Sequence, residues 1–233
     1  MLTLLLFVVF IACVAMMWNE GLWGNALTLL NVTVAGLIAT NYFEPLAYFF
    51  EGNIPSYTYF CDFLALWALF VFVYGVLRTV TDLVARRKVR FRMPVEQGGR
   101  VFFALWAGWI MVGFTAMSLH LAPLPAAPFG GSFYPSNQPP GESTTFLGLA
   151  PDRQWLAFVQ TVSRGSLARG YDKGSAGGRW KYDPHPNDER FNLLAFDSRS
   201  EWILKYRDRR RTLEKYNEAN QAFRVDPNRS ASP

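Results

Sequence analysis

The chain has 233 residues, of which 51% are hydrophobic and 16% aromatic, and its formal net charge is +5 at pH 7. Two cysteines and two histidines are too few for a disulfide framework or a histidine-based metal cluster. Opposite charges alternate closely along the second half of the chain, which predicts a solvated surface rather than a nucleic-acid-binding one.

The two halves of the chain differ in composition. Residues 1–122 hold long apolar runs and seven of the 23 Lys and Arg, whereas residues 123–233 are rich in Pro, Gly and charge. Apolar runs of membrane length indicate transmembrane helices. The sequence therefore predicts an all-α membrane protein, with a four-transmembrane-helix bundle in residues 1–122 and a partly ordered, mainly helical and loop-rich C-terminal tail in residues 123–233. The expected spans are about 2–18, 25–43, 59–79 and 100–121.

The first apolar run, Leu2–Trp18, would be about 25 Å long as a helix, which is just enough for a thin bilayer core. It lacks the basic start of a signal peptide, so an uncleaved span is expected.

The second span carries polar and small residues at helical spacing, among them Asn25, Thr28 and Asn31. An amide that faces lipid is costly, so this stripe is expected to face other helices and to hydrogen-bond across them. The alternative is a polar lining for a substrate path. Glu44-Pro45 is expected to end the helix, because proline cannot donate a helical hydrogen bond.

The third and fourth spans are marked by single polar and small residues. Asp62 lies near the outer end of the third span, where an acid is a candidate functional residue although water is about one turn away. Gly108 follows Ala104 by four residues in the fourth span, a pair that permits close approach of a neighbouring helix. His120 is expected to be an interfacial residue. The candidate interhelical or pathway residues are thus Asn25, Thr28, Asn31, Asp62 and Gly108.

A short basic loop separates the third and fourth spans, and no Lys or Arg precedes Arg78. Loops rich in Lys and Arg stay in the cytoplasm, so the loop 80–98, closed by Pro94 and Gly98-Gly99, is expected to be cytoplasmic. Four spans then put both termini on the extracytoplasmic side of a bacterial inner (cytoplasmic) membrane. The residues expected to determine this topology are Arg86, Arg87, Lys88, Arg90 and Arg92.

The tail is expected to contain a Pro-rich linker, from Pro123 to Gly141, and two short helices near Asp152–Ser166 and Ser200–Phe223. A Gly-rich stretch, Gly165–Gly178, separates the two helices. The arginine triplet of the last helix is expected to form a solvated face, and binding of anionic lipid or a partner is the alternative. The candidate partner or lipid contacts are Trp155, Trp202, Arg209, Arg210 and Arg211.

Two segments of the membrane half resemble motifs of the colicin V production protein (CvpA) family. Gly21-Leu22-Trp23-Gly24-Asn25-Ala26-Leu27 is similar to its Gly-x-x-x-Glu-Ala-Leu pattern, with Asn25 in place of Glu. Gly99-Arg100 through Gly108 is similar to its Asp-Arg-x-x-Gly-x-x-x-Gly pattern, with Gly99 in place of Asp. Two tail segments, Pro151–Val159 and Phe196–Arg211, also resemble tails of longer bacterial members. The resemblance implies four spans and a role in envelope integrity or in colicin V production or export.

Sequence motifs for catalysis are absent: the chain has no nucleophile elbow and no Gly-x-x-x-x-Gly-Lys-Ser/Thr phosphate loop. Neither an enzyme nor a cofactor is therefore expected. An anchor or scaffold, in which four helices hold an external tail for a partner, is the favoured function, and an oligomeric small-solute transporter or channel is the alternative. The expected partners are the lipid bilayer and either further copies of the chain or an envelope protein, not nucleic acid.

Overall fold

The computed structural model describes residues 2–53, 58–85, 93–124, 146–163, 196 and 202–218. Within these ranges the chain forms helices α1 (Leu2–Met17), α2 (Leu22–Asn53), α3 (Thr58–Val84), α4 (Met93–Leu121), α6 (Pro151–Ser163) and α7 (Trp202–Glu218), and no strand. α2, α3 and α4 are long and apolar enough to cross a membrane, and α1 is a shorter apolar helix. The prediction of a mainly helical, membrane-embedded protein is confirmed at this level.

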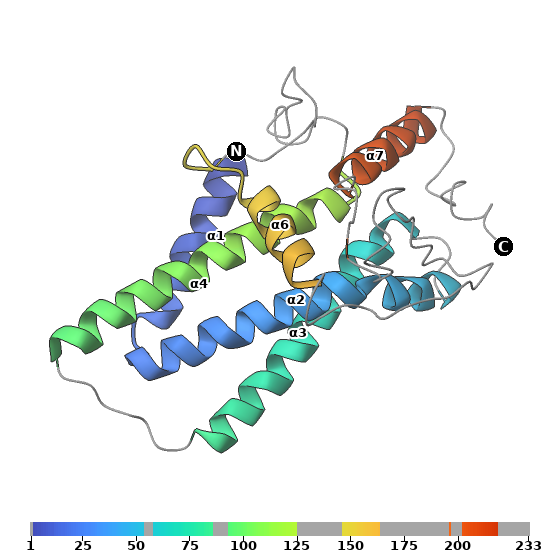
Figure 1. Cartoon of the computed structure of the whole chain (residues 1–233). Helices are drawn as coiled ribbons and strands as arrows, with labels where there is room; N and C mark the ends of the chain where they lie inside the picture. The colour runs from blue at the N-terminus through green and yellow to red at the C-terminus, as the bar shows by residue number, and fades with distance from the viewer. Residues whose placement is uncertain are drawn as a thin grey trace, which may run out of the picture.

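Helices α1 to α4 run back and forth between two ends of an elongated bundle (Figure 1). At one end, called here the Glu20 end, the α1–α2 turn lies beside the last turns of α3 and the first turns of α4. At the other end, called here the Asp62 end, the C-terminal parts of α2 and α4 lie near the start of α3. α6 crosses α4, and α7 lies beyond the C-terminal end of α4, so both tail helices belong to the Asp62 end (Figure 1).

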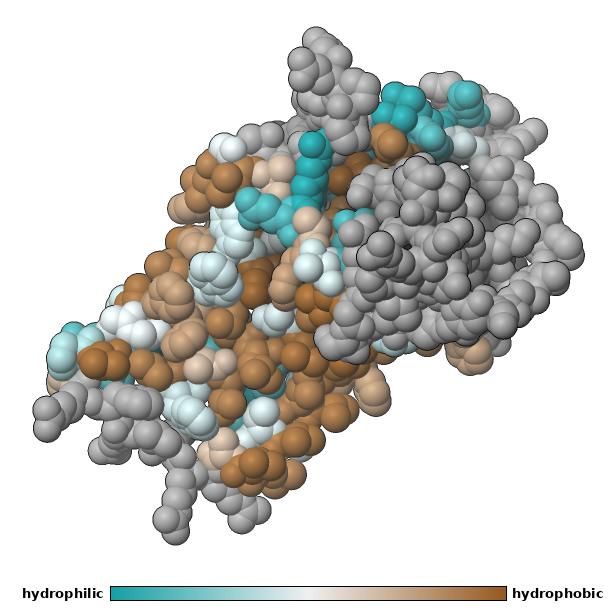
Figure 2. All heavy atoms as spheres, in the orientation of Figure 1, coloured by the Kyte–Doolittle hydropathy of each residue, from teal (hydrophilic) through white to brown (hydrophobic). Residues whose placement is uncertain are grey.

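The tail helices share one hydrophobic core with the long helices. Phe43 of α2, Leu66 of α3 and Phe114 of α4 are buried in the same cluster as Trp155 of α6 and Tyr206 of α7. Burial of large apolar side chains is the main favourable term in folding, so this shared core holds α6 and α7 against the bundle. Hydrophobic residues cover much of the described surface along the bundle, while hydrophilic residues gather near α6 and α7 (Figure 2).

Helix α1 packs antiparallel along α4. Its first turns are buried against the C-terminal half of α4, and its last turn is buried against the N-terminal half. Gly108 lies at the middle of this contact: a Cβ added there would be 3.1 Å from the Phe10 ring and 3.4 Å from Val14. The missing side chain therefore allows the two helices to approach closely.

Helix α2 does not end at Glu44-Pro45, so the expected break is wrong. The helix continues through Pro45 to Asn53 and reaches 32 residues, which is about 48 Å. Thr40 and Asn41 donate from their side chains to carbonyls one turn earlier, over 2.8 and 3.0 Å. Neighbouring helices and polar side chains allow long membrane helices to accommodate proline, and the packing of α2 against α3, α4 and α6 supplies such neighbours.

Helix α4 begins at Met93, earlier than expected, and includes Pro94 and Gly98-Gly99 in its first two turns. Proline is accepted in a first helical turn, because the N–H it lacks has no helical partner there. A Cβ at Gly99 would lie 2.2 Å from Leu22, so this glycine permits the start of α2 to touch α4. The expected loop boundary at 98 is therefore wrong.

Helices α6 and α7 lie in the two segments where tail helices are expected. Helix α6 begins one residue before Asp152, and residues 164–166, 200–201 and 219–223 of the expected helices lie outside the described residues. A tight turn precedes α6, in which Phe146 and Leu149 exchange two backbone hydrogen bonds of 2.9 Å. Leu147 and Gly148 both have positive φ, 51° and 74°, as the central positions of a type I′ turn require. Residues 125–145 of the linker and the Gly165–Gly178 stretch lie outside the described residues.

Candidate functional site

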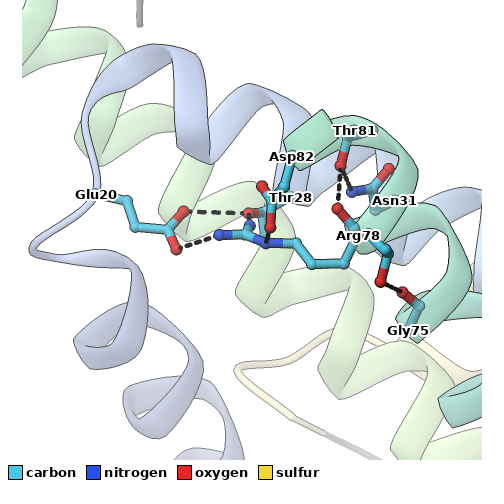
Figure 3. A network of polar contacts seen from close by, with 8 residues as sticks. Glu20, Thr28, Asn31, Gly75, Arg78, Thr81 and Asp82 are labelled. Carbon is cyan, nitrogen blue, oxygen red and sulfur yellow. Dashed lines mark hydrogen bonds and ion pairs between the residues drawn. The ribbon is translucent and has the colours of Figure 1, made fainter. Parts of the chain in front are cut away.

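At the Glu20 end, Arg78 of α3 is the centre of a polar cluster that joins three segments (Figure 3). Its guanidinium donates to Glu20 over 3.0 Å, to Thr28 of α2 over 2.8 Å and to Asp82 one turn later over 3.2 Å. Arg78 and Asp82 are four residues apart and therefore lie on one face of α3. The side chains of Arg78 and Glu20 are about one-third exposed, so this cluster, called here the Arg78 cluster, lies where the bundle reaches water.

The asparagines of the α2 stripe face neighbouring helices. Asn31 Nδ2 donates to Thr81 Oγ1 of α3 over 3.0 Å (Figure 3), and Asn25 Nδ2 donates to the Arg100 carbonyl of α4 over 3.0 Å. Both side chains are fully buried. Their Oδ1 atoms accept no hydrogen bond from the described part of the chain. Each side-chain amide therefore links α2 to another helix through its nitrogen, while its buried oxygen, Oδ1, accepts no hydrogen bond within the described ranges.

At the Asp62 end, Arg209 of α7 forms an ion pair with Asp62 of α3 through Nη1 and Oδ2. The Asp62 side chain is fully buried, and that of Arg209 is 12% exposed. The guanidinium also lies over two aromatic rings, 5.1 Å from the centre of Tyr59 and 5.8 Å from that of Tyr206. The opposite charge and the ring faces together compensate for the loss of water around the guanidinium.

Next to this pair, His120 at the end of α4 connects the two tail helices. Its Nε2 lies 3.0 Å from Asp152 Oδ2 of α6, and both side chains are fully buried. Arg210 of α7 approaches the same imidazole, with Nη1 3.4 Å from Nδ1, and donates to the His120 carbonyl over 3.1 Å. Asp62, His120, Asp152, Arg209 and Arg210 are called here the tail cluster.

The partners of His120 determine its tautomer. A guanidinium can only donate, so the Nδ1 that faces Arg210 must be the acceptor nitrogen of a neutral imidazole. The ring proton then resides on Nε2, which donates to the Asp152 carboxylate. The tail cluster thus pairs the Asp62 carboxylate with the Arg209 guanidinium and the Asp152 carboxylate with the His120 ring.

Tyr206 completes the contact of α7 with the bundle. Its side chain is fully buried, and its ring lies 4.6 Å from that of Trp202. Burial raises the pKa of the Tyr206 hydroxyl well above its ordinary value of 10.0, and the carboxylates of Asp62 and Glu44 raise this pKa further. Lys205 Nζ lies 4.0 Å from Glu44 Oε1 of α2, which adds a contact between α7 and α2 in which the lysine is exposed.

Helix α6 is held in the bundle by Trp155. The indole Nε1 donates to Thr40 Oγ1 of α2 over 3.2 Å, and the ring meets Phe114 of α4 edge-on at 5.9 Å. A Cβ added at Gly36 would lie 2.7 Å from this indole, and one at Gly113 would lie 3.3 Å from Trp155 Cβ. Two glycines on two different spans therefore make room for one tail tryptophan.

Several sequence expectations for the Asp62 end are wrong. Trp155 and Trp202 are 4% and 5% exposed, so they contact this chain rather than lipid or a separate partner. Arg209 and Arg210 belong to the tail cluster instead of a solvated face, whereas Arg211 is exposed as expected. His120 is buried and bonded, not interfacial. The expected topology determinants Arg86, Arg87, Lys88, Arg90 and Arg92 lie outside the described residues.

Sequence reasoning missed His120, Asp152 and Tyr206 as parts of one site. One sequence feature could have indicated the site. Asp62 is an isolated acid in an apolar segment, and because a buried acid needs a cation, a cationic partner could have been expected. Within the described ranges no three His, Cys, Asp or Glu side chains are grouped to hold a metal ion. The contacts of the tail cluster attach the tail helices α6 and α7 to α3 and α4.

Comparison with known proteins gives no relative: no family model, no curated protein and no solved structure matches the chain.

Proposed function

We propose that the chain is a multi-pass protein of the bacterial inner membrane that acts as an anchor or scaffold of the CvpA type, in envelope maintenance or in toxin production or export. In this proposal α1 is a fourth span. The segment 80–98, which includes the end of α3 and the start of α4, is cytoplasmic, and both termini are extracytoplasmic. The docked tail then forms the extracytoplasmic face of the protein, to which an envelope protein or a further copy of the chain binds.

The packing of α1 along α4 supports four spans. A 16-residue helix is about 24 Å long, close to the thickness of a thin bilayer core. Leu4, Phe7, Val8 and Ile11 are exposed by between 47% and 70%, an outward apolar face that hydrocarbon would cover.

The tail cluster is the observation that carries the scaffold proposal. The buried Asp62–Arg209 ion pair and the hydrogen-bonded His120 fix two tail helices to the ends of α3 and α4. Buried charge pairs favour one arrangement over others, because any other arrangement leaves a buried charge uncompensated. A tail held in one position is suited to present a binding surface, and Arg211 is an exposed cation on that surface.

Reporter fusions test the topology. A reporter that works only outside the cytoplasm should be active when fused after Pro233 and silent when fused near Lys88. The opposite pair of results would overturn the topology and the external tail.

The alternative function is an oligomeric small-solute transporter or channel. The observation in its favour is that buried Oδ1 atoms of Asn25 and Asn31, on the α2 stripe, accept no hydrogen bond within the described ranges. Free buried acceptors could line a path for a polar solute. Flux assays with purified protein in liposomes separate the two functions: solute movement above that of protein-free liposomes supports transport, and its absence supports the anchor.

A further inference from the structure

A groove of about 680 Å³ runs along one flank of the bundle, between α1, α4 and α6. Cavities that hold small ligands have volumes of about 300–1,000 Å³. Helix α4 supplies most of one wall through residues spaced by three and four positions, which therefore lie on one face. These are Phe102, Leu105, Trp106, Trp109, Ile110 and Gly113.

The groove has the depth of one leaflet. From Phe102 to Gly113 helix α4 rises about 16 Å, which is roughly half of a ~30 Å hydrocarbon core. Helix α6 lies over its far end: a Cβ at Gly113 would be 3.0 Å from the Pro151 carbonyl oxygen. The groove thus runs along α4 from Phe102, on the side of the Glu20 end, and stops beneath α6.

The walls suit a hydrocarbon chain. Phe102 and Trp106 are 56% and 54% exposed, and Phe158 of α6 is 40% exposed. The polar atoms at the rim bind one another, since Trp109 Nε1 donates to Gln154 Oε1 over 3.0 Å. A polar ligand would gain little from such a surface, whereas a flexible apolar chain would fill it.

We propose that this groove binds one acyl chain of a membrane phospholipid from the leaflet at the Glu20 end, with the methyl end of the chain beneath α6. The proposal rests on membrane insertion of α4 and is independent of the scaffold role. When α4 spans a bilayer, hydrocarbon is the medium that contacts this flank. A concave site closed at one end surrounds a chain on several sides, and the exposed Val71 and Phe72 of α3 do not line this groove.

The test uses the full chain, reconstituted into vesicles of phosphatidylethanolamine and phosphatidylglycerol. A small fraction of the phosphatidylethanolamine carries a photoreactive diazirine at the end of one acyl chain. After illumination, labelled peptides are identified by mass spectrometry. The expected result is that the α4 segment around Trp106 and Ile110, and Phe158 of α6, carry far more label than the α3 segment with Val71 and Phe72.

Two matched substitutions locate the site. Leu105→Trp places a larger side chain in the groove, and Leu64→Trp makes the same change on α3 at a residue of similar exposure, 42% against 45%. Leu105→Trp should remove most of the label around Trp106, and Leu64→Trp should leave it unchanged.

The ratio of label on α4 to label on α3 in the unaltered chain decides the question, even if a variant does not fold. Equal labelling of both faces would show ordinary boundary lipid and overturn the proposal. Protection of Trp106 from label together with cross-links between chains would show that a second copy occupies the groove, and would also overturn it.

Discussion

Replacement of Asp62 by asparagine should release α7 from the bundle. The substitution keeps the size of the side chain but removes the carboxylate that faces Arg209, a residue whose side chain is 12% exposed. Removal of one partner from a buried ion pair typically costs ~3–5 kcal/mol, because the other charge stays buried without compensation. An exposed pair contributes only about 0–1 kcal/mol. The buried value applies here because Asp62 is fully buried.

This cost corresponds to an increase of roughly 150- to 5,000-fold in the ratio of detached to docked α7. Amide hydrogen exchange of the full chain in lipid nanodiscs measures it, since detachment exposes the backbone of Trp202–Glu218. Asp208→Asn is the matched control. It makes the same chemical change in α7, at a residue whose side chain is 66% exposed and pairs with Arg207.

A double-mutant cycle separates the pair from its surroundings. Asp62→Asn combined with Arg209→Gln removes both charges and should restore much of the protection that Asp62→Asn alone loses. If Asp62→Asn accelerates exchange in α7 no more than Asp208→Asn does, the ion pair does not hold the tail and the reasoning fails.

Three further outcomes are expected. Gly36→Ala should destabilise the docking of α6 by ~1–3 kcal/mol, because the added Cβ would lie 2.7 Å from Trp155. Proteolysis of α6 should therefore be faster than in the control variant Gly75→Ala, in which the added Cβ meets nothing within 4 Å. Trp155→Phe removes the hydrogen bond to Thr40 and leaves its hydroxyl buried, so thermal unfolding in detergent should show a loss of ~1–3 kcal/mol; an unchanged midpoint would argue against that bond. The pKa of Tyr206 is raised in the docked state, so the contribution of Tyr206 to docking of α7 is fully present below the ordinary pKa of about 10 and is lost as pH rises above it. Tyr206→Phe should abolish this alkaline dependence in exchange measurements.

Local sequence patterns predict the helices well, because each helix depends on residues a few positions apart. Apolar runs of sufficient length define α2, α3 and α4, and the three-residue spacing of Asn25, Thr28 and Asn31 correctly suggests a buried polar stripe. Pro45 is the exception. A local rule ends the helix there, but contacts with neighbouring helices maintain it to Asn53.

The tail cluster could not be predicted in the same way. Asp62 and Arg209 are 147 positions apart, and His120 and Arg210 are 90 positions apart. Nothing in the spacing of either charge specifies the other, and an arginine triplet in a charged helix is typical of a solvated face. The pairing depends on how α6 and α7 cross the bundle, which is a property of the whole fold.

The long separation between Asp62 and Arg209 also sets an order of events during synthesis. Asp62 enters the membrane domain with α3, well before the ribosome has made the guanidinium that neutralises it. During that interval the acid must remain near water at the end of the span or take up a proton. A chain that stops before Arg209 therefore has a membrane domain in which α7 supplies no cation to this carboxylate.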